Sequence, residues 1–130
     1  MIFTPRTIAV VVFLCVFAGC KHDRASNQAA ADLRARMLPS GASATDPRTS
    51  WASGASILAE WDIRTDLKRD ALESWLSEAL KPDFTKTSTA EDRICFAKYD
   101  DGESKRLEVY VTSESEGRTI AHVRLTIAPD

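Results

Sequence analysis

Residues 55–80 read ASILAEWDIRTDLKRDALESWLSEAL, and the spacing of the apolar residues changes once within this stretch. As far as Arg64, apolar and polar residues alternate, which predicts a strand whose buried face carries Trp61. From Leu67 to Leu80 the apolar residues recur on a period of 3.6, which predicts an amphipathic helix. Pro82 follows directly and ends the helix.

The C-terminal third of the chain contains three further stretches that are typical of strands. These are Arg93–Tyr99, Lys105–Ser113 and Thr119–Ala128. Short turns with a glycine, Asp100–Glu103 and Glu114–Gly117, separate them and indicate hairpins. The segment before them, Asp83–Ala90, is polar and is predicted to be a loop.

This order predicts an α+β fold, a small β-α-β-β-β domain over residues 51–130. In it, one amphipathic helix packs on one face of an antiparallel sheet, which buries the apolar side of both.

The charge balance bears on the class of partner. The 130 residues include 17 basic and 19 acidic side chains, a formal net charge of −2. Nucleic-acid-binding domains usually carry a basic stripe, so we expect no nucleic-acid partner.

The first 20 residues have the layout of a bacterial signal peptide. Arg6 precedes an uncharged apolar run from Ile8 to Ala18. A helix of that run is about 16 Å long, roughly half of a ~30 Å bilayer core, which argues against a permanent membrane span.

The run ends in Phe17-Ala18-Gly19-Cys20, which resembles the lipobox of bacterial lipoproteins, although Phe17 stands where leucine is usual. The resemblance implies cleavage between Gly19 and Cys20, a diacylglycerol on the Cys20 thiol and an acyl chain such as palmitate on its amine. It therefore implies a lipid-anchored protein of the cell envelope. Lys21 after the cysteine favours, in a Gram-negative cell, the outer membrane facing the periplasm. The alternatives are an ordinary signal peptide with Cys20 as a bystander, or a short uncleaved anchor.

Residues 20–50 are predicted to be the lipidated cysteine and a flexible tether. The stretch is rich in Ala, Ser, Arg and Asp, and its large apolar residues are only Leu33, Met37 and Leu38. Residues 27–38 could form a short helix, but without a wide apolar stripe such a helix is not expected to be stable alone.

The sequence contains few residues that indicate a catalytic site. After cleavage the chain keeps two histidines, His22 in the tether and His122 on the last predicted strand, where it alternates with the apolar face and is expected to point into solvent. No Cys-x-x-Cys motif accompanies them, so no metal and no cofactor are expected. No residue is assigned a catalytic role.

Two features keep an enzymatic alternative open. Glu60 and Asp62 share a strand face and could act as an acid–base pair if burial separated their pKa values. Arg64 on the same face favours a neutralised row of solvated side chains instead. Cys95 could be a reactive thiol, but no basic cluster lies near it in sequence, and a packing role is favoured.

One face of the sheet is a candidate partner surface. If Ile94 and Phe96 face the helix, the opposite face is left uncovered. That face would carry Leu58, Tyr99, Tyr110 and His122, with Arg124 on its rim. We therefore expect a small protein-binding domain, an assembly accessory or an inhibitor of an envelope protein. The alternative is a small envelope enzyme, or a subunit of one, that uses the acids or Cys95.

Overall fold

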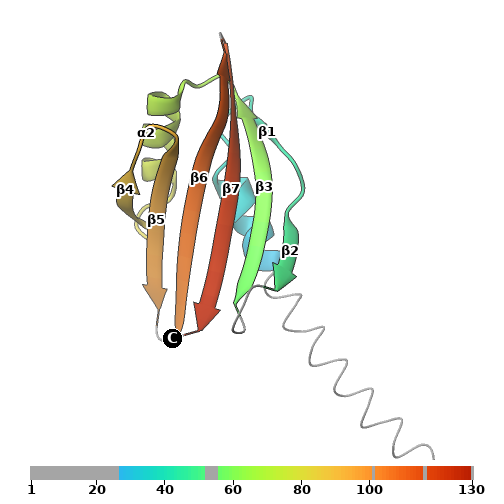
Figure 1. Cartoon of the computed structure of the whole chain (residues 1–130), viewed down its shortest axis with the longest axis vertical. Coiled ribbons are helices and arrows are strands. Elements are labelled where there is room, and N and C mark those ends of the chain that lie inside the picture. Colours follow the sequence, from blue (N-terminus) through green and yellow to red (C-terminus); the bar gives the residue numbers. More distant parts are fainter. Residues whose placement is uncertain (1–26, 52–55, 101, 116, 130) are drawn as a thin grey trace, which may run out of the picture.

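The described residues form a seven-stranded antiparallel sheet with two helices on one face, so the predicted α+β class is confirmed (Figure 1). The structure is a computed structural model, and it describes residues 27–51, 56–100, 102–115 and 117–129. The predicted signal peptide, including Gly19 and Cys20, lies outside the described residues.

The four longest strands correspond to the four predicted strands. They are β3 (Ile57–Thr65), β5 (Arg93–Asp100), β6 (Glu103–Ser115) and β7 (Arg118–Pro129). The predicted helix is α2 (Arg69–Ala79), which begins two residues later than predicted and ends before Pro82.

Three short strands were not predicted: β1 (Ser43–Ala44), β2 (Arg48–Trp51) and β4 (Thr85–Thr89). The order across the sheet is β1-β3-β7-β6-β5-β4, and β2 also pairs with β3. The prediction of a loop over residues 83–90 is therefore wrong. β4 reads TKTST with all five residues exposed, because an edge strand pairs on one side only and needs no apolar alternation.

The core lies between the helices and one face of the sheet. Ile57, Ala59, Trp61 and Ile63 of β3 are each at most 6% exposed and alternate with the more exposed residues of that strand. The helix α2 contributes Leu72 and Leu76 to the same core cluster. Ile94 and Phe96 also face the helices, at 0% and 1% exposure, as the sequence analysis supposed.

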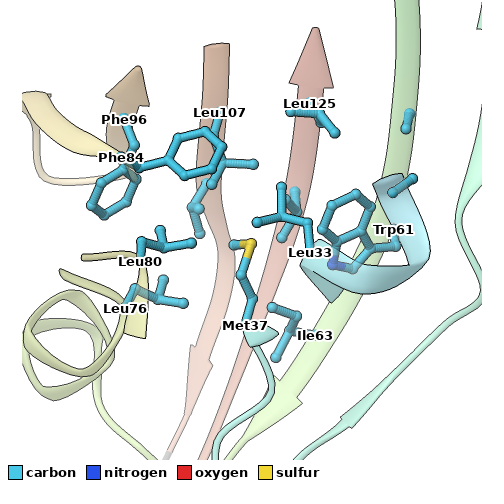
Figure 2. Packing of buried hydrophobic residues seen from close by; sticks show 14 of the residues in the cluster. Leu33, Met37, Trp61, Ile63, Leu76, Leu80, Phe84, Phe96, Leu107 and Leu125 are labelled. Carbon is cyan, nitrogen blue, oxygen red and sulfur yellow. The ribbon is translucent and has the colours of Figure 1, made fainter. Parts of the chain in front are cut away.

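The second helix, residues 27–36, was assigned to the flexible tether, and that prediction is wrong for residues 27–50. Ala30, Leu33 and Met37 are 0%, 7% and 0% exposed and belong to the core cluster. Figure 2 shows Met37 in the middle of that cluster, between Ile63 and Leu76. Three apolar positions form too narrow a stripe for an isolated helix, but they suffice where a sheet already offers an apolar surface.

Two arginines fix this helix to its surroundings. Arg36 donates to the carbonyl oxygens of Ala79 and Lys81, at 2.7 and 2.9 Å, and pairs with Asp83 at 2.5 Å. It thereby satisfies carbonyl groups at and just after the C-terminal end of α2, where cations are favoured. Arg34 donates to the carbonyl oxygens of Ala44 and Thr45, which connects the helix to β1 and the residue after it.

Within the described residues, no helix is both long and apolar enough to cross a membrane.

Candidate partner-binding face

Both helices lie on the same side of the sheet, behind it in Figure 1, and the described residues place no helix on the other side. We call this second side the open face. Residues that lie directly opposite each other on paired strands share a face of the sheet. The strand register therefore arranges the side chains of the open face in rows. From the β6–β7 turn downward, the four main rows are Arg93–Tyr110–His122–Asp62, Cys95–Glu108–Arg124–Glu60, Ala97–Arg106–Thr126–Leu58 and Tyr99–Ser104–Ala128.

His122 lies at the centre of a group of charges on the open face. Its Nδ1 is 2.8 Å from Oδ1 of Asp62, and its Nε2 is 3.4 Å from Oε2 of Glu60. His122 points away from the core as expected, but its imidazole is only 28% exposed and lies between two carboxylates. Both ring nitrogens therefore face a carboxylate of β3.

The two carboxylates predicted to pair along their own strand instead pair across the sheet. Glu60 meets Nε of Arg124 at 3.4 Å as well as His122, and Asp62 meets His122. The predicted partner Arg64 lies one row further on, opposite Ile120. These contacts join β3 to β7 and hold the side chains of the open face in fixed positions.

A second group of charges lies on β5 and β6. The hydroxyl of Tyr110 donates to Oε2 of Glu108 at 2.5 Å, and Nη1 of Arg93 is 3.8 Å from the same oxygen. The pKa of the Arg93 guanidinium is raised above its ordinary value, first by hydrogen bonding with Tyr110 and further by nearby charges that include Glu108. Arg93 therefore presents a fixed positive charge beside a phenol ring.

The cations of the open face are arginines. In the described strands these are Arg48, Arg64, Arg93, Arg106, Arg118 and Arg124. The lysines of the described strands are on the helix side of the sheet. Lys86 lies opposite Phe96, and Lys98 lies opposite Lys105. Protein interfaces are enriched in Arg and Tyr and depleted in Lys, so this division resembles the composition of a binding surface.

The structure brings together three of the five residues proposed for the partner face. Tyr110 and His122 are direct neighbours, and Arg124 lies in the adjacent row. Leu58 lies one row below Arg124, whereas Tyr99 lies at the far end of the face with 76% exposure.

Two arginines of this face, Arg106 and Arg48, were not predicted. Arg106 alternates with Leu107 and Val109 on β6, so strand periodicity could have found it. Arg48 lies on β2, opposite Glu60, in a strand with no apolar alternation to reveal it.

The remaining candidates provide little for chemistry. Cys95 is a free, partly buried thiol on the open face, opposite Glu108. A hollow of about 260 Å³ lies beside Asp62 and Arg64, and another of about 570 Å³ lies beside Thr85 and Tyr99. Within the described part of the chain, no three His, Cys, Asp or Glu side chains are grouped to hold a metal ion.

Comparison with known proteins gives no relative. No protein-family model matches the chain, and neither a curated protein nor a solved structure matches it.

Proposed function

We propose that the protein is a lipid-anchored protein of the bacterial envelope whose domain binds another protein through the open face, as an assembly accessory or an inhibitor. In a Gram-negative cell the domain would face the periplasm from the outer membrane. The anchor rests on the likeness of Phe17-Ala18-Gly19-Cys20 to a lipobox. The binding role rests on the open face.

The observation that carries the binding role is the arginine–tyrosine arrangement around Tyr110. Arg and Tyr dominate binding hot spots because they combine apolar area with directed hydrogen bonds. On the open face their positions are fixed by Glu60 and Glu108, which accept from or pair with Arg124, Arg93 and Tyr110. A surface that is already ordered loses less conformational entropy when a partner binds.

The signs of the charges point to the kind of partner. Asp62, Glu60 and Glu108 lie between the arginines, so the face alternates in sign across the sheet. Such a surface is complementary to a protein with both acidic and basic side chains, and it is a poor match for a uniformly negative polymer.

In-cell photocrosslinking tests the binding role. A photoreactive residue at Tyr110 samples the open face, and one at the exposed Lys68, at the start of α2, provides the control. We expect Tyr110 to capture one dominant envelope protein that Lys68 does not capture. That protein, once purified, should bind the wild-type domain, and it should bind the Arg124→Ala variant of the domain more weakly. Equal capture from both positions, or none, would contradict the proposal.

The anchor is tested separately by metabolic labelling with an alkyne fatty acid. Wild-type protein should carry the label and the Cys20→Ser variant should not. Label that persists in Cys20→Ser would show that the chain is lipidated elsewhere.

A further inference from the structure

The chain enters the described fold at one end of the sheet. The hydroxyl of Thr49 donates to Oδ1 of Asn27 at 2.8 Å, which places the beginning of the described helix beside β2. β2 ends at Trp51, opposite Ile57 at the beginning of β3, and Ile57 lies opposite Ile127. We call this end of the sheet the entry end.

The entry end also includes the β5–β6 turn. Ile127 lies opposite Lys105, which lies opposite Lys98, and Tyr99 follows one residue later. The C-terminal end of β7 is there as well, in the lower part of Figure 1.

Two large side chains with apolar surface are exposed in the described residues, and both are at the entry end. Trp51 is 60% exposed and Tyr99 is 76% exposed, whereas Trp61 of the core is 1% exposed. Tryptophan and tyrosine are the side chains that concentrate at the boundary between lipid and water, because an apolar ring and a polar group are joined in each.

The folded position of residues 27–36 limits how far this end can be from a membrane. If Cys20 carries the proposed lipid, seven Cα steps separate it from Asn27. Seven fully extended residues span at most about 25 Å. The entry end is then held near the lipid surface, whereas a tether of the predicted length would have let the domain move much further away.

Charge at the entry end is nearly balanced. Nζ of Lys98 is 3.5 Å from Asp100, and Nζ of Lys105 is 3.5 Å from Glu103. The described residues of this end therefore form no basic patch for anionic lipid, and we expect the aromatic rings to provide the attraction.

From these observations we propose that Trp51 and Tyr99 lie in the headgroup region of the bilayer, so that the domain rests on the membrane by its entry end. This inference rests on the proposed lipid anchor. It gives the domain a second membrane contact and presents the open face sideways, toward a partner at the same membrane.

Tryptophan quenching in vesicles tests this contact. The mature, lipidated protein is reconstituted into phosphatidylcholine vesicles, with or without phosphatidylcholine brominated near the headgroup end of its acyl chains. We expect bromine to quench part of the tryptophan emission of the wild-type protein. This quenching should be absent in Trp51→Phe and should persist in Trp75→Phe. Quenching should be unchanged in 0.5 M salt, a concentration that screens surface charges strongly.

The outcomes separate the two proposals. Protein that does not float with the vesicles contradicts the lipid anchor. Protein that floats but shows no Trp51-dependent quenching overturns the membrane contact and leaves the anchor intact. Quenching that disappears in high salt also overturns it, because the attraction would then be electrostatic.

Discussion

The two faces of the sheet differ in what their side chains contact. On the covered face, residues such as Trp61, Phe96 and Leu107 are no more than 1% exposed and meet two helices. On the open face the same strands present arginines, carboxylates, Tyr110 and His122, with ion pairs that join β3 to β7 and β5 to β6. Because successive residues of a strand point to opposite sides, stability and recognition can be set by alternate residues of one segment.

The difference predicts that substitutions on the covered face change the free energy of unfolding, whereas substitutions on the open face change binding. Four substitutions test this division, and their expected effects on stability range from several kcal/mol to almost none.

Met37→Ala should lower the free energy of unfolding by about 2–5 kcal/mol, the usual cost of truncating a fully buried Met or Leu. Met37 is 0% exposed although it lies in the segment predicted to be a tether. Urea unfolding of the mature chain measures the loss. Asp32→Ala on the exposed side of the same helix is the control and should change stability by less than about 0.5 kcal/mol. Equal values for the two variants would mean that the helix is not docked.

Arg36→Ala should cost about 1.5–3 kcal/mol, the range for hydrogen bonds to a charged group. Its guanidinium contacts two carbonyl oxygens and Asp83, between the two helices. Arg36→Lys keeps the charge but cannot reproduce the planar set of donors, and it should fall between wild type and Arg36→Ala. Full stability of Arg36→Ala would show that the contacts add nothing.

Acid should weaken the attachment of the β4 edge to α2. The pKa of Glu73 is lowered from 4.5, first by hydrogen bonding to Thr89 and then by the charges of Arg69 and Lys86, against an opposing effect of burial. A carboxyl whose pKa is lowered in the folded state stabilises above its unfolded pKa, and this contribution is lost as the pH falls through the folded value. Urea midpoints of wild type and Glu73→Gln should therefore differ at pH 6 and converge toward pH 3. A constant difference at both pH values would contradict this origin.

Arg106→Ala on the open face should change stability least, by less than about 0.5 kcal/mol, because the side chain is exposed and truncating it creates no cavity. Thermal unfolding checks this value. A loss as large as that of Met37→Ala would make the open face part of the structural core and remove the distinction between the faces.

The sequence predicted the elements that carry a clear period. α2 and the strands β3, β6 and β7 were found because apolar residues recur along each at 3.6 or 2 residues, and β5 was found because its segment is rich in strand-forming residues. β4 was missed because TKTST has no apolar residue. A helix over residues 27–38 was expected to be unstable alone, and its docking on the sheet was missed because its stripe contains only Ala30, Leu33 and Met37.

The contacts of the open face were less accessible to sequence reasoning. His122 and Asp62 are 60 residues apart, and only the β3–β7 pairing brings them together. Periodicity assigns each side chain to a face of its own strand, but it does not give the register between strands, so the rows could not be predicted.

The most direct test of the difference between the faces is the double variant Arg93→Lys and Arg124→Lys, examined for stability and for capture by the Tyr110 photocrosslinker together. Both substitutions keep the positive charge and remove the planar guanidinium on which arginine contacts depend. We expect the free energy of unfolding to stay within about 1 kcal/mol of wild type. Capture of the partner should fall by about tenfold or more, which corresponds to roughly 1.4 kcal/mol of binding free energy. Undiminished capture would contradict the account of the open face as a binding surface. A loss of capture would also contradict it if the double variant were destabilised enough to account for that loss.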